Sequence, residues 1–117
     1  MSELTENQNK EVIKTLTPQN AFELIKNHKE LTLIDIRTPE EFSRGHVEGA
    51  VNLDYYSEDF EKQLEKLDKE KKYIIYCGSG VRSTKTSRSM EDMGFVDLYI
   101  ILGGFAGWKI NKLPITH

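Results

Sequence analysis

The feature that most constrains the fold of this chain is an alternation of short apolar runs with segments of helical character. The runs have the length and composition of buried strands. We predict strands at residues 12–16, 31–36, 50–53, 73–76 and 98–102. Strands that alternate with helices fold as an α/β domain, in which helices cover both faces of a mainly parallel sheet. The sequence therefore predicts a small, doubly wound α/β domain with five strands.

Several of the intervening helices have recognisable start signals. Thr17-Pro18 and Thr38-Pro39 are each typical of a helix N-cap followed by a proline in the first turn. Glu41 stands three residues after Thr38, which is the spacing of a capping box. Ser57 is predicted to cap the next helix. A further helical segment is predicted at residues 83–93, and residues 103–108 are predicted to form a turn that leads into a short helix.

The strongest candidate for chemistry is the loop after strand 73–76, with the sequence Cys77-Gly78-Ser79-Gly80-Val81-Arg82-Ser83. This loop opens a predicted helix, and a helix N-terminus offers unpaired backbone N–H groups and a partial positive charge. Gly78 and Gly80 have no side chains, so the loop amides are free to curl around one atom. Arg82 adds a permanent cation. These features favour a reactive thiolate at Cys77 over the alternative, an inert structural cysteine.

The composition argues against several other classes of function. The chain has 117 residues, which suits one domain, and its net charge of −3 gives no broad basic surface for nucleic acid. No apolar run approaches transmembrane length, so no membrane partner is expected. Cys77 is the only cysteine and the three histidines are widely spaced, so neither a metal site nor a cofactor is expected.

The cysteine count and the N-terminal segment also bear on location and domain limits. One cysteine allows no intramolecular disulfide, which agrees with a reducing compartment. The segment Met1–Lys10 is polar and lacks the apolar stretch of a secretory signal, so a cytoplasmic location is expected. Residues 1–11 are expected to form a flexible lead-in, and residues 12–117 a single domain.

Three groups of residues are expected to meet at one edge of the predicted sheet. Asp35-Ile36-Arg37, Cys77 and Gly103-Gly104 all stand at or just after the ends of predicted strands. In α/β sheets, ligands bind outside the carboxyl ends of the strands. The edge that carries Cys77 is therefore the predicted site.

Three blocks of this sequence resemble the rhodanese-like family of single-domain sulfurtransferases. The first block runs from Leu33 to Phe42 and continues through Gly45 to Asn52. The second is the loop from Cys77 to Ser83, and the third is Gly103-Gly104-Phe105-Ala106-Gly107-Trp108. With the order of the strands, the resemblance covers nearly all of residues 15–115.

The resemblance implies a fold, a reaction and a set of site residues. The fold is a small α/β domain with a five-stranded parallel sheet. The reaction moves a sulfane sulfur from thiosulfate or a persulfide donor onto the loop cysteine, and the resulting persulfide passes it to a thiophilic acceptor, a thiol or cyanide. By resemblance Cys77 carries the sulfur and Arg82 binds the small anionic donor. The backbone amides that would hold the terminal sulfur belong to Gly78, Ser79, Gly80, Val81 and Arg82.

Asp35 and Arg37 match positions at the strand end in the family pattern. One interpretation is that they shape the cysteine loop by hydrogen bonds or an ion pair, in a supporting role. The alternative is a purely structural Asp–Arg pair near the start of the next helix.

Two other functions stay open at this point. A persulfide carrier would hand sulfur to a protein acceptor without rapid turnover of small donors. It is suggested by the lone cysteine and by Gly78, where many members of the family have Arg, Lys or Gln. A small phosphatase or arsenate reductase would share the thiolate and arginine, but the related cell-cycle phosphatases have a longer loop than the four residues between Cys77 and Arg82.

Overall fold

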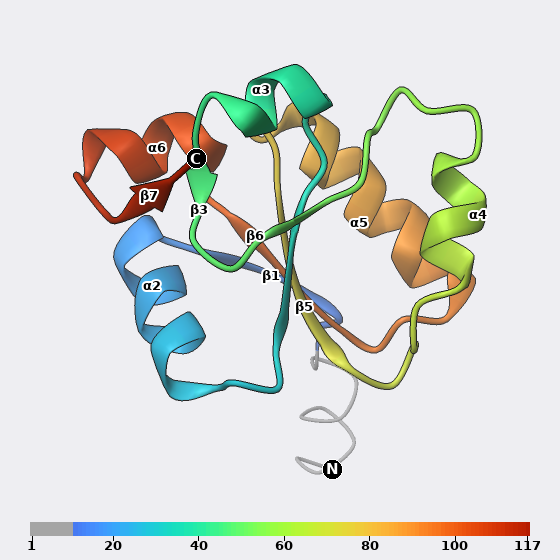
Figure 1. Cartoon of the computed structure of the whole chain (residues 1–117). Helices are drawn as coiled ribbons and strands as arrows, with labels where there is room; N and C mark the ends of the chain where they lie inside the picture. The colour runs from blue at the N-terminus through green and yellow to red at the C-terminus, as the bar shows by residue number, and fades with distance from the viewer. Residues whose placement is uncertain (1–10) are drawn as a thin grey trace, which may run out of the picture.

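The computed structural model describes residues 11–117, and a five-stranded sheet forms its centre (Figure 1). The strand order is β1-β6-β5-β2-β4, and all neighbouring strands are parallel. The strands are β1 (Ile13–Leu16), β2 (Thr32–Asp35), β4 (Val51–Asn52), β5 (Lys72–Tyr76) and β6 (Asp97–Ile101). The predicted α/β class and five-stranded parallel sheet are confirmed. The predicted lead-in lies outside the described residues except for Glu11, so the domain boundary at residue 12 stays a prediction.

Helices cover both faces of this sheet, as the alternation in the sequence predicts (Figure 1). One face is covered by α2 (Pro18–Asn27) and α6 (Gly104–Ile110), and the other by α4 (Phe60–Glu65) and α5 (Val81–Met93). The short helix α3 (Pro39–Ser43) lies beyond the carboxyl end of β2. Helix α5 begins two residues earlier than predicted, at Val81 instead of Ser83.

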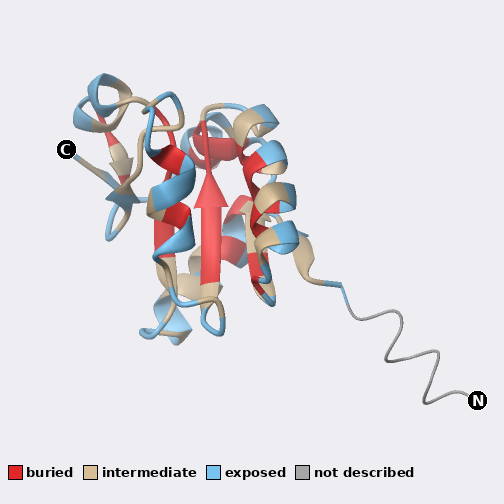
Figure 2. Ribbon diagram, turned by 90° about the vertical axis from the view of Figure 1, so that its right-hand side faces the viewer, coloured by how far each residue is buried: buried red, intermediate tan, exposed pale blue. Residues whose placement is uncertain are grey.

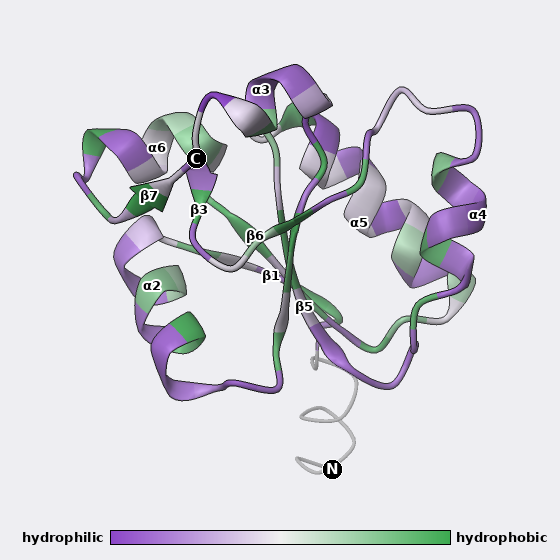
Figure 3. Ribbon diagram, in the orientation of Figure 1, coloured by the Kyte–Doolittle hydropathy of each residue, from purple (hydrophilic) through white to green (hydrophobic). Residues whose placement is uncertain are grey.

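The central strand β5 separates two apolar cores. Its side chains alternate, so Tyr73 and Ile75 face the α4/α5 core while Ile74 and Tyr76 face the α2/α6 core. Figure 2 shows buried residues along the strands of the sheet and on the helix faces that pack against it, and Figure 3 shows apolar residues on the sheet with polar residues on the outer helix surfaces. Cys77 continues the first series and lies on the α4/α5 side.

Two of the predicted helix caps are present and one is wrong. Thr17 accepts a hydrogen bond from the Asn20 N–H at the start of α2, and Thr38 and Glu41 form a complete capping box on α3. Ser57 does not cap α4: the helix starts after Asp59, and the Ser57 hydroxyl bonds the Asp59 carboxylate.

A second, two-stranded antiparallel sheet was not predicted. It pairs β3 (His46–Val47) with β7 (Ile115–Thr116) and ties the end of the chain to the segment after α3. Each of these strands has two residues, too few to show a period-two pattern in the sequence. Only their pairing in three dimensions identifies them.

Candidate active site

Cys77 stands at the carboxyl end of the central strand, where β5 passes into the loop before α5. Because it continues the alternation of β5, its side chain points under the loop and the residue is 1% exposed. A reagent must therefore enter the loop to reach the sulfur.

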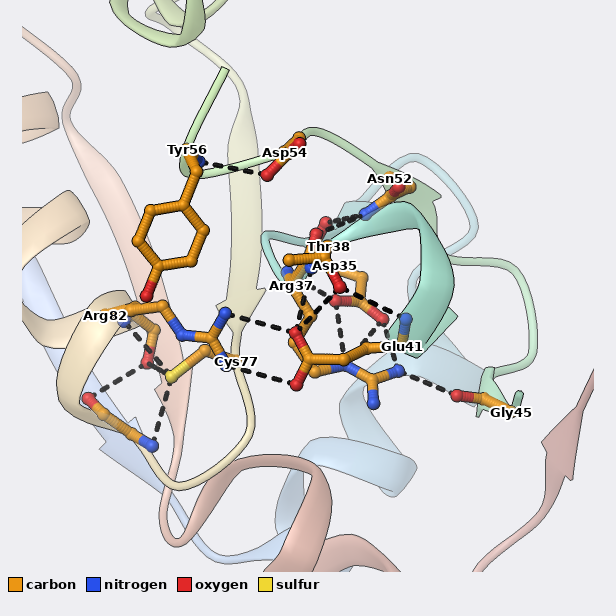
Figure 4. Close-up of polar contacts among 12 residues, drawn as sticks. Asp35, Arg37, Thr38, Glu41, Gly45, Asn52, Asp54, Tyr56, Cys77 and Arg82 are labelled. Atoms are coloured by element: carbon orange, nitrogen blue, oxygen red, sulfur yellow. Dashed lines mark hydrogen bonds and ion pairs between the residues drawn. The ribbon is translucent and has the colours of Figure 1, made fainter. Parts of the chain in front are cut away.

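Two backbone amides of the loop point at the Cys77 sulfur (Figure 4). The Gly80 N–H donates to Sγ at 3.1 Å and the Ser83 N–H at 3.3 Å. Gly80 has a φ of +115°, a conformation that residues with side chains rarely adopt. The glycine at this position therefore allows the chain to turn its amide inward.

Hydroxyl groups at the start of α5 hold the Gly80 peptide in place. Its carbonyl accepts from the Ser83 hydroxyl at 3.2 Å and from the Thr84 hydroxyl at 2.7 Å. It also accepts from the Thr84 N–H at 3.0 Å. The polar residues in the first turn of α5 therefore fix the loop that surrounds the sulfur. The sequence alone gave no reason for this polarity.

The environment favours the thiolate form of Cys77. Burial on its own raises the pKa of this thiol, because it penalises the charged form. Against burial act the Ser83 hydroxyl, 3.5 Å from Sγ, and the N–H groups of Ser83, Gly80 and Arg82. Together they outweigh burial, and the pKa of Cys77 lies below its ordinary value. The loop thus stabilises negative charge on sulfur.

Helix α6 holds the same loop from behind. The Phe105 N–H donates to the Cys77 carbonyl at 2.8 Å, and the Ala106 N–H donates to the Gly78 carbonyl at 3.0 Å. A Cβ atom on Gly104 would lie only 2.6 Å from the Cys77 carbonyl oxygen, so a glycine is required for this approach. The predicted meeting of Cys77 with Gly103-Gly104 at one sheet edge is confirmed.

Arg82 lies beside the loop in a pair with Glu41 of α3 (Figure 4). Its Nη1 and Nη2 atoms lie 3.2 Å and 3.4 Å from the two carboxylate oxygens. The guanidinium carbon also lies 5.7 Å from the centre of the Tyr56 ring. Attraction to the Glu41 carboxylate, and to the Cys77 sulfur, raises the pKa of Arg82 against the opposing effect of burial. The cation is therefore present next to the thiol, but it has a carboxylate partner.

Asp35 and Arg37 pair with each other at 2.8 Å on the other side of the sheet edge. Arg37 also donates to the Gly45 carbonyl at 2.7 Å, and its guanidinium carbon lies 4.1 Å from the centre of the Phe105 ring. The hydrogen bonds that these two side chains make join β2 to the segment after α3. Within the described part of the chain neither side chain makes a hydrogen bond to residues 77–83.

Only some of the loop residues predicted to surround the sulfur interact with it. Of the five residues whose amides were predicted to face it, Gly80 donates to Sγ directly and the Arg82 amide adds to the lowering of the thiol pKa. In the described part of the chain, Gly78, Ser79 and Val81 make no hydrogen bond to Sγ. Ser83 was not among the predicted site residues. Its position in the first turn of the helix after the loop could have indicated that its N–H faces the sulfur.

The structure also shows what this part of the chain does not contain. Within residues 11–117 no group of three or more His, Cys, Asp or Glu side chains is placed to hold a metal ion. No helix formed by these residues has the length and apolar character needed to cross a membrane.

Comparison with known sequences places this chain among proteins of similar length. The model of the rhodanese-like domain matches residues 17–111. The thiosulfate sulfurtransferase GlpE of Glaesserella parasuis is 35% identical over 105 residues, which cover 90% of this chain and 94% of that protein.

Solved structures give a consistent picture of the fold. A rhodanese-related protein from Thermoplasma volcanium has a TM-score of 0.77 at 22% identity and covers 88% of this chain and 97% of its own. A protein of unknown function from Rhodopseudomonas palustris, described as a possible tyrosine phosphatase, has a TM-score of 0.72 at 29% identity. That match covers 89% of this chain and 85% of the other.

Proposed function

The chain belongs to the rhodanese-like domain family, and from this premise we propose that it is a sulfurtransferase of the thiosulfate sulfurtransferase type, with Cys77 as the sulfur carrier. The observation that carries the proposal is the pair of loop amides, Gly80 and Ser83, that donate to the Cys77 sulfur. Donors fixed in this way stabilise a thiolate before the reaction and an anionic persulfide after it.

The first half of the reaction loads the cysteine. The Cys77 thiolate attacks the outer, sulfane sulfur of thiosulfate, and a new S–S bond forms at Sγ. The bond between the two sulfur atoms of thiosulfate breaks, and sulfite leaves with the electron pair. Arg82 reduces the repulsion between the two reacting anions, because its guanidinium lies beside the loop.

The second half of the reaction discharges the persulfide. A cyanide ion or a thiolate attacks the terminal sulfur, and the Cys77 thiolate leaves with the electron pair. The products are thiocyanate or a new persulfide on the acceptor. The loop amides ease this step also, since they stabilise the departing thiolate.

Thiocyanate production from thiosulfate and cyanide tests the proposed activity. Wild-type protein is expected to produce thiocyanate with turnover, and Cys77→Ser is expected to fall to the uncatalysed rate. Circular dichroism of both proteins checks that the serine variant is folded. Equal rates for the two proteins would contradict the proposal.

A persulfide carrier serving a partner protein is the second candidate. The lone cysteine supports it, because the chain has no second thiol that could resolve a persulfide on Cys77 and the sulfur must pass to an outside acceptor. Intact-mass measurement after incubation with thiosulfate decides between the two. One added sulfur on Cys77 with negligible thiocyanate production identifies a carrier, whereas rapid turnover identifies the enzyme.

Phosphatase activity is the third possibility, and its support is the possible phosphatase with a similar fold from Rhodopseudomonas palustris. The four-residue spacing between Cys77 and Arg82 argues against it, since a phosphate group needs more room than one sulfur atom. Hydrolysis of an aryl phosphate by wild type but not by Cys77→Ser would establish it.

A further inference from the structure

Glu41 holds Arg82 with both carboxylate oxygens, and α3 holds Glu41. The two N···O distances of 3.2 Å and 3.4 Å describe a fork-to-fork pair. The same carboxylate accepts the Thr38 N–H at 2.9 Å, which fixes it at the start of α3. Burial raises the pKa of Glu41, but hydrogen bonds from Arg82 and Thr38 outweigh this effect and lower it. Glu41 is therefore charged at neutral pH.

This pair changes the charge that an incoming donor meets. The Arg82 guanidinium is the cation next to the sulfur, and the Glu41 carboxylate offsets its charge. When Cys77 is a thiolate, the net charge of the Cys77, Arg82 and Glu41 side chains together is negative. A dianion such as thiosulfate is repelled by this arrangement more than an organic persulfide that reacts in its protonated form, R–S–SH, and so carries less negative charge.

Gly78 leaves room beside the Arg82 guanidinium. A Cβ atom on Gly78 would lie 3.3 Å from Nη2 of Arg82, closer than most side-chain contacts. A larger residue would press on the guanidinium, and a basic one would add a second cation at the mouth. With no side chain at position 78, the charge that offsets the Arg82 cation comes from Glu41.

The other flank of the loop suits an organic donor. A hollow of about 550 Å³ lies beside Ser79 and Gly80, and the apolar side chains of Val81 and Leu102 line it. These two side chains are 63% and 58% exposed. The basic residues Lys85 and Arg88 also line this hollow, farther along α5. The hollow thus offers apolar surface and positive charge beside the loop residues Ser79 and Gly80, in a place that suits the body of an organic donor.

We propose that Glu41 is a specificity-determining residue that neutralises Arg82 and so favours sulfur transfer from organic persulfides over transfer from thiosulfate. The inference rests on the proposed function. In the favoured step the Cys77 thiolate bonds to the outer sulfur of a persulfide, R–S–SH, and the donor S–S bond breaks. The thiolate R–S⁻ leaves with the electron pair, and the proton stays on the transferred sulfur.

The test is Glu41→Gln, with Glu40→Gln as the matched control. The glutamine oxygen can still accept from the Thr38 N–H and from Nη1 of Arg82, two bonds that Oε1 accepts in the wild type, and only the bond from Nη2 is lost. Glutamine also serves in a capping box, so the variant removes charge with little change of shape. Glu40 is exposed on the same helix and loses the same charge without a contact to Arg82. The measurement is the second-order rate of Cys77 persulfide formation, by intact mass, with thiosulfate and with glutathione persulfide.

For Glu41→Gln the loading rate with thiosulfate is expected to rise by roughly threefold to tenfold, and the rate with glutathione persulfide by less than about twofold. Added salt should shrink the difference, because it screens charge. Glu40→Gln should change both rates by less than about twofold.

The outcomes separate the two proposals. If wild type loads from both donors but the ratio of the two rates is the same in Glu41→Gln, the inference is wrong and the sulfurtransferase proposal stands. A fall in the thiosulfate rate would also overturn it, since Glu41 would then only position Arg82. If neither donor loads Cys77 in wild type, both proposals fail.

Discussion

Arg37 and Arg82 each meet a carboxylate near the same edge of the sheet, but in opposite surroundings. The side chains of Arg37 and Asp35 are 6% and 0% exposed, and Arg37 also contacts Phe105 and the Gly45 carbonyl. The side chains of Arg82 and Glu41 are 20% and 37% exposed. One pair is enclosed by protein, and the other borders solvent next to the candidate nucleophile.

The difference in exposure between the two ion pairs indicates that the buried pair acts in folding and the exposed pair in the reaction. A buried ion pair has lost its water, so removal of one partner leaves a charge that nothing compensates. A partly exposed pair contributes little to stability, but its cation remains able to act on an incoming anion. We therefore expect substitutions at Arg37 to act on folding and substitutions at Arg82 to act on sulfur transfer.

The largest expected effect is that of Arg37→Ala on stability. Asp35 would be left buried and charged without its partner, at a cost of about 3–5 kcal/mol in the free energy of unfolding. Urea unfolding of this variant and of Arg82→Ala gives the comparison, with a loss below about 1 kcal/mol expected for the second. Similar losses in the two variants would remove the distinction between the pairs.

Gly104→Ala is expected to have the next largest effect, and it connects folding to the site. Its φ of +60° is strained for alanine, and the new Cβ would lie 2.6 Å from the Cys77 carbonyl oxygen. We expect a loss of about 2–4 kcal/mol in stability, together with slower loading of Cys77, because the loop must shift.

Gly49→Ala is the control for the Gly104 substitution. Gly49 has a φ of +91° but no atom within 4 Å of the added Cβ. It should lose about 1–2 kcal/mol from backbone strain alone and load sulfur at the wild-type rate. If both variants load normally, the contact between α6 and the loop has no role in the site.

Arg82→Ala tests whether the exposed pair acts in the reaction. Without the cation beside the thiolate, the rate of loading from thiosulfate is expected to fall by about tenfold to a hundredfold. Arg82→Lys should recover part of this rate, since it restores the charge without the planar fork that binds Glu41. An unchanged rate in Arg82→Ala would mean that the exposed pair is as structural as the buried one.

Ser83→Ala is expected to have the smallest effect. The hydroxyl of Ser83 lowers the pKa of Cys77, so its removal should raise that pKa by less than about one unit. At pH values below the pKa, the thiolate fraction and the loading rate should fall accordingly. Ser89→Ala, later on the same helix, is the control and should leave the loading profile unchanged.

The sequence predicted most of the fold because its signals are local. Apolar runs located the five strands, and the Thr38-Pro39 start with Glu41 located α3. The β3–β7 pair was missed because two-residue strands carry no pattern, and Ser57 was misread because Asp59 at the helix start was the nearer polar residue.

The cysteine loop was predictable from the sequence, whereas the contacts between this loop and other elements were not. Cys77 and its glycines form one continuous segment, so the loop and its inward amide at Gly80 followed from the sequence. The Glu41–Arg82 pair joins residues 41 positions apart, and only the packing of α3 against the loop brings them together. The role of the Ser83 and Thr84 hydroxyls also depends on where the Gly80 carbonyl points.

The account depends most on the claim that the loop stabilises negative charge on the Cys77 sulfur. The direct measurement is the ultraviolet absorbance of the thiolate as a function of pH, taken as the difference between wild type and Cys77→Ser. This difference cancels the tyrosine signals and requires no reagent to reach the sulfur. The account predicts a midpoint below the ordinary thiol pKa of about 8.5. A midpoint at or above that value would contradict it.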